Sequence, residues 1–132
     1  MTKKQMLIID DEAENLNLLR RTFIREYSVY SADNAKDALT ILNEKPGISL
    51  IISDQRMAEM TGTEFFKIIA KDRPDIMKIL LTAYTDMEAL VDAINEGQIY
   101  KYITKPWDPE ELKLTIKRAY EVYDLAEENK RL

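Results

Sequence analysis

The amino-acid sequence predicts a single α/β domain in which helices cover both faces of a parallel sheet. Short apolar or β-branched runs alternate five times with segments whose apolar residues recur every three or four positions, which is the pattern of strand–helix units. The runs LII at 7–9 and LII at 50–52 are apolar without alternation, as expected for strands buried on both faces. A length of 132 residues with 45% apolar content fits one domain with a real core.

The strands and helices can be placed in chain order from these patterns. The predicted strands are 6–9, 28–31, 49–52, 76–81 and 99–103. The second run, SVYS, alternates in polarity, so we expect it at an edge of the sheet. The helical apolar positions are Leu16, Leu19 and Phe23; Ala35, Ala38, Leu39 and Leu42; Phe65, Phe66 and Ile69; Met87, Leu90, Val91 and Ile94; and Leu112, Ile116, Ala119 and Tyr123.

Residues that favour helix starts and stops lie between these elements. Asparagine, aspartate and threonine side chains cap the first helical turn, and proline or glycine ends a helix. The predicted starts are Asp33-Asn34, Thr85-Asp86 and Asp108-Pro109, and the predicted stops are Pro46-Gly47 and Gly97. No repeat, linker or low-complexity stretch interrupts the alternation.

Composition excludes several classes of function for this segment. The net charge is −5 and like charges form no block, whereas a nucleic-acid-binding surface needs a basic stripe. The chain has no cysteine, so it has no disulfide, thiol nucleophile or thiolate metal site. No apolar run is long enough for a signal-peptide core or a membrane span. We therefore expect a cytoplasmic segment that binds neither nucleic acid nor membrane directly.

Chemically active side chains follow the ends of four predicted strands. They are Asp10, Asp11, Asp54, Thr82 and Lys105. Because the carboxyl ends of parallel strands lie at one edge of an open sheet, and ligands bind at that edge, we expect these residues to converge. Each has an ordinary explanation when taken alone: the first acids can cap a helix, the threonine can bond a loop amide, and the lysine can be solvated.

The expected convergence of three carboxylates predicts a metal ion. Carboxylates packed together repel one another and destabilise the fold unless a cation offsets their charge. The set contains oxygen ligands without histidine or cysteine, which favours a hard ion. An ion that keeps several waters beside phosphate oxygens is Mg²⁺ rather than Ca²⁺ in an all-protein cage. The sequence therefore predicts Mg²⁺ as the cofactor.

At this point the residues match a known family. From Asp10-Asp11 through DQRMAEMTG at 54–62 and LLTAY at 80–84 to YITKPW at 102–107, the chain resembles the receiver domain of two-component response regulators. The resemblance covers essentially the whole length. It implies a flavodoxin-like (βα)5 doubly wound parallel sheet with strand order 2-1-3-4-5, and it implies a phosphorylation-controlled signalling domain rather than an enzyme acting on a separate substrate.

The resemblance also implies roles for individual residues. Asp54 is the implied phosphoryl acceptor. The implied Mg²⁺ ligands are Asp10, Asp11, Asp54 and the backbone carbonyl of Arg56. Moving a phosphoryl group onto a carboxylate requires an in-line approach and neutralisation of charge on the transferring oxygens, which a metal ion and a lysine can supply.

The remaining implied roles concern the end of the sheet. Thr82 would hydrogen-bond one phosphoryl oxygen and Lys105 would pair with another. Tyr102 falls at the family's aromatic switch position, so Thr82 and Tyr102 would couple phosphorylation to the face formed by the fourth helix, the fifth strand and the fifth helix. The resemblance further implies a cis peptide bond between Lys105 and Pro106, although most X-Pro bonds are trans.

The partners follow in part from what the chain lacks. It contains no histidine, so the phosphohistidine that donates the group in this family must belong to another protein. We expect a histidine kinase or a phosphotransfer protein as donor, and an output domain or partner protein as the target of the switch. The chain would catalyse only its own phosphorylation and dephosphorylation.

The sequence departs from the family pattern at several positions. Ala58 stands where members usually have proline, which removes a fixed φ from the loop after the acceptor. Tyr100 and Lys101 stand where regulators that dimerise through the fourth and fifth helices to bind DNA commonly have an acidic pair, which argues against that class. Trp107 and the long tail are similar to receivers with ATPase, cyclic-dinucleotide phosphodiesterase or phosphatase outputs, and the sequence does not choose among them.

Three other classes of function were weighed. A haloacid-dehalogenase-like phosphatase also uses an aspartate nucleophile and Mg²⁺, but it needs a second acid two residues later, where this chain has Arg56. A degenerate receiver that acts only as a scaffold would be expected to have lost part of the site, which is complete here. A nucleotide-binding module needs a glycine-rich phosphate loop, which Gly47, Gly62 and Gly97 do not form.

The last helix is predicted to run from Pro109 toward Leu132, longer than the domain requires. We expect a receiver domain over 1–124, with 125–132 continuing the helix and starting a linker to an output domain. Val122, Leu125, Asn129 and Leu132 have the spacing of a heptad seam with one polar core position, which favours a parallel homodimer. The alternative is an amphipathic last helix with a frayed, charged end.

Two bulky residues are expected to prolong the phosphorylated state. By resemblance, Arg56 and Tyr84 flank the path by which water attacks the acyl phosphate. A guanidinium and a phenol ring should crowd an in-line water, so we predict slow self-dephosphorylation. The alternative is that Arg56 reaches into solvent and Tyr84 packs on the fourth helix.

Overall fold

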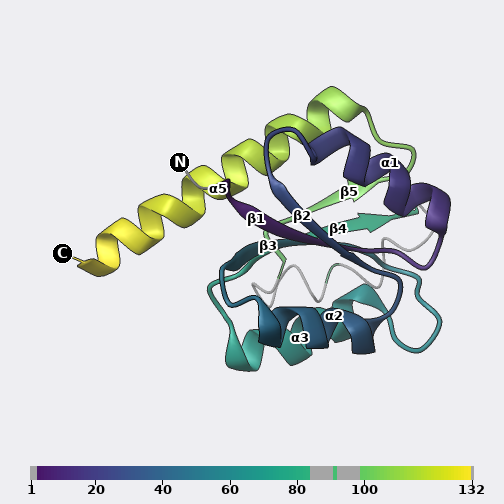
Figure 1. Ribbon diagram of the computed structural model, residues 1–132, viewed down its shortest axis with the longest axis horizontal. Coiled ribbons are helices and arrows are strands. Elements are labelled where there is room, and N and C mark those ends of the chain that lie inside the picture. Colours follow the sequence, from purple (N-terminus) through teal and green to yellow (C-terminus); the bar gives the residue numbers. More distant parts are fainter. Residues whose placement is uncertain (1–2, 84–90, 92–98, 132) are drawn as a thin grey trace.

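A computed structural model describes residues 3–83, 91 and 99–131, and the structural statements below concern these residues. Five parallel strands form one sheet in the order β2-β1-β3-β4-β5 (Figure 1). Their bounds are β1 Gln5–Ile9, β2 Ser28–Ala32, β3 Ile48–Asp54, β4 Met77–Thr82 and β5 Lys101–Thr104. The predicted fold class and strand order are confirmed, and β2 is an edge strand as expected.

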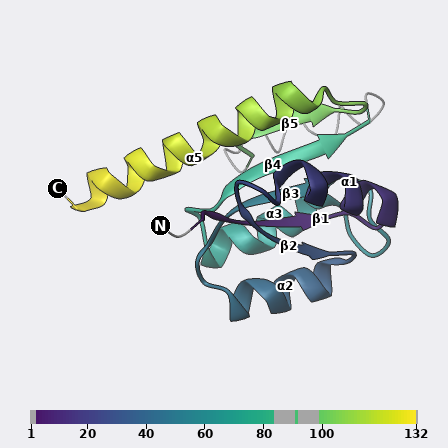
Figure 2. The same ribbon diagram turned by 45° about the horizontal axis from the view of Figure 1, so that its top comes forward.

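Helices cover both faces of the sheet. Helix α1 (Ala13–Phe23) and helix α5 (Pro109–Arg131) lie on one face, and helices α2 (Ala35–Glu44) and α3 (Gly62–Asp72) lie on the other (Figures 1 and 2). Two apolar cores result, one on each side of the sheet. In β1, Leu7 and Ile9 enter the core beneath α2 and α3, while Met6 and Ile8 enter the core beneath α1 and α5. Burial on both faces explains why this strand is apolar without alternation.

Helix starts agree with the capping signals in the sequence. The Asn34 side chain accepts a hydrogen bond from the Asp37 backbone N–H at 2.8 Å, and Asp108 accepts one from the Glu110 N–H at 3.0 Å. Helix α3 begins with a capping box at Thr61, which the sequence analysis did not identify. The predicted start at 85–86, most of the predicted helix at 87–94 and the stop at 97 lie outside the described residues.

The strand boundaries differ slightly from the predicted ones. Ile76 and Ile99 were expected to begin strands, but β4 begins at Met77 and β5 at Lys101. Both isoleucines are nevertheless buried. Apolar character therefore extends beyond the hydrogen-bonded ladder into the segments that lead into it, and periodicity cannot separate a buried lead-in from a strand.

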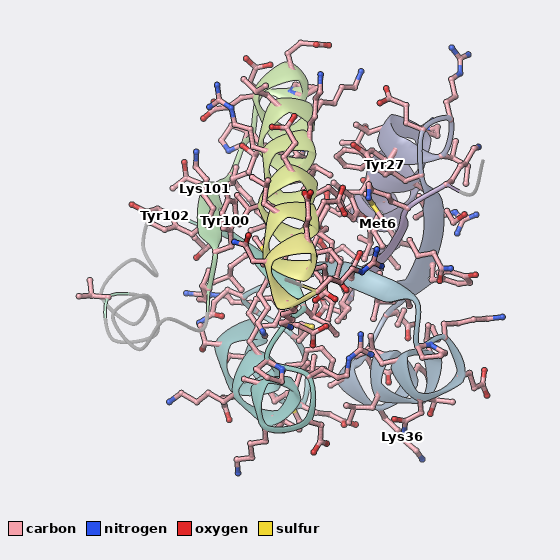
Figure 3. All side chains as sticks on the ribbon, turned by 90° about the vertical axis from the view of Figure 1, so that its left-hand side faces the viewer. Met6, Tyr27, Lys36, Tyr100, Lys101 and Tyr102 are labelled. Carbon is pink, nitrogen blue, oxygen red and sulfur yellow. The ribbon has the colours of Figure 1, made fainter. Side chains whose placement is uncertain are left out.

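Helix α5 extends beyond the sheet and is fastened to its amino-terminal edge. The Tyr120 hydroxyl donates to the Gln5 backbone carbonyl at 2.8 Å, and Lys4 pairs with Asp124 at 2.7 Å. Tyr120 also stacks on Tyr27, with ring centroids 5.1 Å apart. Burial, chiefly, raises the pKa of Tyr120 far above its usual range. The remaining turns project away from the domain, and Figure 3 views them nearly end-on.

The predicted long helix is confirmed as far as Arg131, whereas Leu132 lies outside the described residues. The apolar residues of the proposed seam are open to solvent: Val122 is 44% exposed and Leu125 is 61% exposed. Among the described residues, no helix combines the length and the apolar character needed to cross a membrane.

Candidate functional site

The carboxyl ends of the strands place the predicted site residues at one edge of the sheet. Asp54 is the last residue of β3 and Thr82 the last of β4, while Asp10 and Lys105 directly follow β1 and β5. Two hydrogen bonds continue the ladder past the strand ends: the Asp10 N–H donates to the Ala32 carbonyl at 3.2 Å, and the Lys105 N–H donates to the Thr82 carbonyl at 2.9 Å. These bonds fix the backbone from which the two side chains project.

Lys105 and Asp54 form an ion pair at this edge. The Lys105 Nζ lies 2.7 Å from Asp54 Oδ1. The Asp54 side chain is only 6% exposed, and that of Lys105 is 25% exposed, so the pair is shielded while one side stays open to solvent. The peptide bond between Lys105 and Pro106 is cis, which confirms the expectation drawn from the family resemblance.

Three carboxylates gather beside this pair. Asp10, Asp11 and Asp54 each offer an oxygen, and these oxygens lie within 4.8 Å of one another. Asp10 is fully buried, whereas Asp11 is exposed. Burial is the main cause that raises the pKa of Asp10; the Glu12 N–H opposes this effect and the charge of Asp54 adds to it. The charged form of Asp10 is therefore unfavourable unless a cation is near.

One oxygen of Asp10 shows where a cation fits. Oδ1 accepts a hydrogen bond from the Glu12 N–H at 2.9 Å, but Glu12 is the N-cap residue and α1 has no side-chain cap, so Asp10 does not cap the first helix. Oδ2 is buried and has no hydrogen-bond partner among the described residues. A buried carboxylate oxygen without a donor is costly, and a hard divalent ion would satisfy it. The residues present therefore fit the predicted Mg²⁺.

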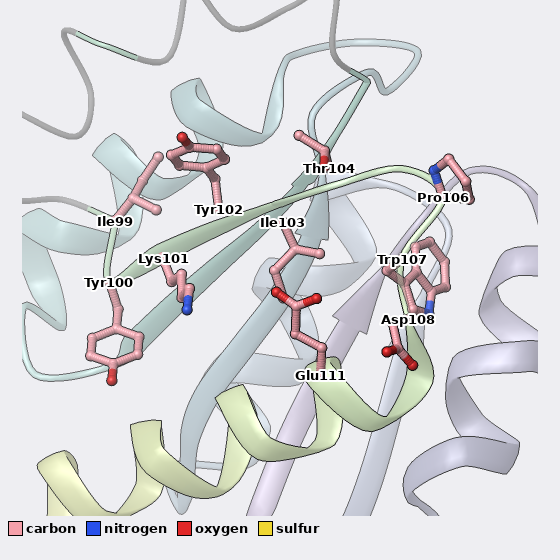
Figure 4. Close-up of a pocket in the computed structure, with 10 residues that line it drawn as sticks. All are labelled: Ile99, Tyr100, Lys101, Tyr102, Ile103, Thr104, Pro106, Trp107, Asp108 and Glu111. Atoms are coloured by element: carbon pink, nitrogen blue, oxygen red, sulfur yellow. The ribbon is translucent and has the colours of Figure 1, made fainter.

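Thr82 and Tyr102 lie on the same face of the sheet. Thr82 is fully buried, and its Oγ1 donates to the Ala83 carbonyl at 3.2 Å. In the register of β4 and β5, Leu80 pairs with Tyr102 and Thr82 pairs with Thr104, so Thr82 is the diagonal neighbour of Tyr102. Figure 4 shows Tyr102 and Thr104 on one side of β5, with Lys101 and Ile103 on the other.

Beside this strand lies a pocket of about 420 Å³. Residues of β5 and its flanks line it together with Trp107, Asp108 and Glu111 at the start of α5 (Figure 4). Tyr102 is half-buried and packs against the core beneath α2 and α3 while it also borders the pocket. It therefore connects the interior near Thr82 with an open surface.

The loop from β3 to α3 requires glycine at one position. The Gly62 N–H donates to the Gln55 carbonyl at 2.9 Å, which brings the first turn of α3 against the end of β3. A Cβ atom at Gly62 would lie 2.6 Å from the Asp54 backbone oxygen and 2.7 Å from Leu80 Cδ1. Real Cβ atoms essentially never approach other atoms so closely, so the close approach depends on glycine.

The remaining predicted residues are placed as follows. Arg56 lies in the β3–α3 loop with an exposed side chain. Tyr84 lies outside the described residues. Sequence reasoning missed Gln55, a polar side chain next to Asp54 that is only 5% exposed. A glutamine between two charged residues gives no sign that it will be buried, because burial there depends on the position of α3.

The sheet order and the cluster of carboxylates and lysine at its carboxyl edge define a flavodoxin-like domain whose acidic edge could hold a metal ion. The family model of the response regulator receiver domain matches residues 6–117. The chain therefore belongs to the response regulator receiver family, whose domains accept a phosphoryl group on an aspartate in two-component signalling and are not enzymes of the ordinary kind.

Individual relatives agree with this assignment. Over its full length the chain is 39% identical to hydrogenase transcriptional regulatory protein HoxA of Cupriavidus necator, covering 28% of that protein. It is 34% identical to DNA-binding transcriptional regulator NtrC of Proteus hauseri, over 93% of the chain and 26% of that protein. The solved signal receiver domain of an HD domain-containing protein from Pseudomonas fluorescens Pf-5 superposes with a TM-score of 0.88 at 32% identity, covering 100% of this chain and 96% of that one. The chain spans about a quarter of the length of the curated relatives it matches.

Proposed function

We propose that this domain accepts a phosphoryl group on Asp54 from a partner histidine kinase or phosphotransfer protein in a Mg²⁺-dependent reaction. The observation that carries the proposal is the ion pair between Asp54 and Lys105, held at 2.7 Å beside two further carboxylates. Asp54 is nearly buried, and its Oδ1 faces the Lys105 ammonium, which can pair with a phosphoryl oxygen once the carboxylate carries one. This segment contains no histidine, so the phosphohistidine of the proposed donor lies outside it.

The proposed reaction is a simple displacement. A carboxylate oxygen of Asp54 attacks the phosphorus of a phosphohistidine, the P–N bond breaks, and the imidazole leaves with the electron pair and takes up a proton. Lys105 then pairs with a phosphoryl oxygen instead of the free carboxylate. Asp10, Asp11, Asp54 and the backbone carbonyl of Arg56 would hold Mg²⁺, which supplies positive charge at the transferring oxygens when bound.

Thr82 and Tyr102 are proposed to convert this event into a signal. The phosphoryl group adds negative charge and acceptor oxygens at the edge of the sheet. The Thr82 hydroxyl, which now donates to a neighbouring backbone carbonyl, can turn to donate to one of these oxygens. The space that it leaves lies beside Tyr102, its diagonal neighbour. Movement of Tyr102 would alter the face built from the fourth helix, β5 and α5.

The whole protein is proposed to be a cytoplasmic regulator in which this receiver controls an output domain. Two curated relatives are transcriptional regulators by name, and one solved neighbour comes from an HD domain-containing protein. We place any nucleic-acid binding in the output rather than in this acidic segment, because its net charge is −5. The segment after residue 124 would connect the two parts.

Intact-mass measurement tests the proposed function. The protein is incubated with Mg²⁺ and acetyl phosphate, and the same is done with Asp54→Asn and without Mg²⁺. We expect one phosphoryl group on the wild type, and none on the variant or in the Mg²⁺-free sample. Rapid turnover of added phosphoesters would instead indicate a phosphatase, and no modification under any condition would indicate a scaffold; either result refutes the proposal.

A further inference from the structure

Gln55 follows the acceptor directly and makes four hydrogen bonds that join β3, β4 and α3. Its N–H donates to the Leu81 carbonyl at 2.9 Å, and its carbonyl accepts from the Gly62 N–H at 2.9 Å. Its side-chain Oε1 accepts from the Thr63 N–H at 3.0 Å, while Nε2 donates to Thr63 Oγ1 at 3.3 Å. A buried carboxamide with both ends bonded holds one orientation.

These bonds satisfy the first turn of α3. The first N–H groups of a helix have no partner within the helix. Here the Gly62 N–H and the Thr63 N–H are both taken up by Gln55, and the Glu64 N–H is taken up by the Thr61 hydroxyl at 3.2 Å. Thr61 in turn contacts Thr63 through their hydroxyl oxygens at 3.1 Å. Gln55, on the other side of the loop, thus accepts two of these N–H groups, and Thr61 accepts the third.

Gln55 links the two ends of the loop formed by residues 56–61. Gln55 stands at the start of this loop, and its carboxamide reaches the helix that follows the end. Within the loop, Ala58 leaves φ free, where a proline would fix it. The loop also carries the backbone carbonyl of Arg56, so its conformation decides where that carbonyl points. The Gln55 carboxamide is thus one of the side chains that hold this loop from outside, along with Ser53, whose hydroxyl lies 3.8 Å from Met57 Sδ.

We propose that Gln55 is a positioning residue for the divalent cation: its carboxamide holds the β3–α3 loop so that the Arg56 carbonyl faces the carboxylates of Asp10 and Asp54. This inference rests on the proposed function, because it assumes that the acidic cluster binds Mg²⁺. Gln55 itself touches neither the ion nor the phosphoryl group. Residues that orient metal ligands typically change metal affinity by about tenfold or more when they are replaced.

The test compares Gln55→Met with a control that loses one hydrogen bond elsewhere. Methionine keeps the length and flexibility of the side chain but removes both carboxamide bonds. Tyr120→Phe removes the bond to the Gln5 carbonyl at the opposite edge of the sheet and leaves the site untouched. Thr63→Val removes the hydroxyl that contacts both Gln55 and Thr61 but keeps the Thr63 N–H bond to Gln55, so it provides a milder variant in case Gln55→Met fails to fold.

Three readouts are expected to separate positioning from general damage. Calorimetric titration with Mg²⁺ alone should show a dissociation constant raised roughly tenfold in Gln55→Met, raised less in Thr63→Val, and unchanged in Tyr120→Phe. The Thr63 amide should exchange its hydrogen faster in Gln55→Met, while the Glu64 amide keeps its protection. Phosphorylation at saturating Mg²⁺ should stay within about twofold of the wild type, since only the ground-state affinity for the ion is reduced.

The outcomes distinguish this inference from the proposed function. If wild-type protein does not bind Mg²⁺, the proposed function fails and the inference fails with it. If wild type binds Mg²⁺ and the Gln55 and Thr63 variants bind it equally well, only the positioning role is overturned. A rise of the same size in Tyr120→Phe would likewise overturn it, because the effect would then reflect stability rather than loop geometry.

Discussion

Replacing Gly62 by alanine should destabilise the domain and disturb the acceptor at the same time. The added Cβ would lie 2.6 Å from the Asp54 backbone oxygen and 2.7 Å from Leu80 Cδ1. The first contact is with backbone at the end of a buried strand, which cannot move without shifting Asp54 itself. Relief therefore requires that the first turn of α3 move away from β3, which stretches the bond between the Gly62 N–H and the Gln55 carbonyl.

The expected size of the effect follows from two opposing contributions. Forcing extra volume into a packed site costs about 1–3 kcal/mol. Alanine also restricts the unfolded chain, which returns about 0.4–1 kcal/mol. The net loss is therefore about 1 kcal/mol in the free energy of unfolding, or a melting temperature lower by roughly 3–5 °C for a domain of this size.

Gly47→Ala provides the matched control. A Cβ atom there would meet only the end of the Gln5 side chain, at 2.8–3.1 Å, and a flexible side chain can move aside. This variant should unfold within about 0.5 kcal/mol of the wild type, as expected for an accommodated surface substitution. Urea unfolding of both variants and acetyl phosphate labelling of Asp54 check the prediction. Equal stability of the two alanine variants would show that the close approach at Gly62 is not tight, and the reasoning would be refuted.

Four further predictions concern the site, the lifetime of the phosphorylated state, the switch and the tail. Asp10→Asn should raise the free energy of unfolding at neutral pH without Mg²⁺, because burial raises the pKa of Asp10 and the stability that its protonated form gives is lost as pH rises through that pKa; thermal melts that show no gain would contradict this. The double variant Arg56→Asn with Tyr84→Ala should lose its phosphoryl group faster than the wild type in Mg²⁺, and equal decay rates would mean that these side chains do not gate water. Tyr102 should change rotamer when beryllofluoride binds, which side-chain NMR can follow, and an unchanged rotamer would remove it from the switch. In sedimentation experiments the 132-residue chain should dimerise more strongly than a version ending at Asp124, because the shorter version lacks every seam residue after Val122, including the exposed Leu125. Equal monomer fractions would argue against the seam.

Much of the fold could be predicted from the sequence because its signals are local and repeated. The LII runs of β1 and β3 carry the signature of strands buried on both faces, and Asn34 carries the signature of a helix start. The boundaries of β4 and β5 were less accurate, since Ile76 and Ile99 are buried without belonging to the ladder. Apolar residue types indicate which positions are buried, whereas the hydrogen bonds that define a strand depend on where the neighbouring strand begins and ends.

For the site too, some features could be predicted from the sequence and others could not. Asp10, Asp54 and Lys105 could be identified because each lies at the end of a strand and the topology of a parallel sheet brings strand ends together. The burial of Gln55 beside the site, and of Lys78 near the opposite end of β4, could not be predicted. Lys78 is only 4% exposed and donates to the Ile76 carbonyl at 2.9 Å, and burial lowers its pKa. A lysine in a strand is ordinarily read as facing solvent, and only the assembled structure shows that it has a partner inside.

The attachment of α5 determines how a signal could leave the domain. The helix begins beside the cis bond at Lys105, close to the acceptor, and its 23 residues span about 34 Å at 1.5 Å per residue. The bond from Tyr120 to Gln5 at the start of β1 and the ion pair of Asp124 with Lys4 hold its middle against the amino-terminal edge of the sheet. Helix α5 is held between its start and these two anchors, so a small tilt at its start would move the far end in the opposite sense, through a somewhat smaller arc because the anchors lie nearer to Arg131 than to Pro109. Phosphorylation would then change the direction in which the chain leaves Arg131, without any contact between that part of the chain and the phosphoryl group.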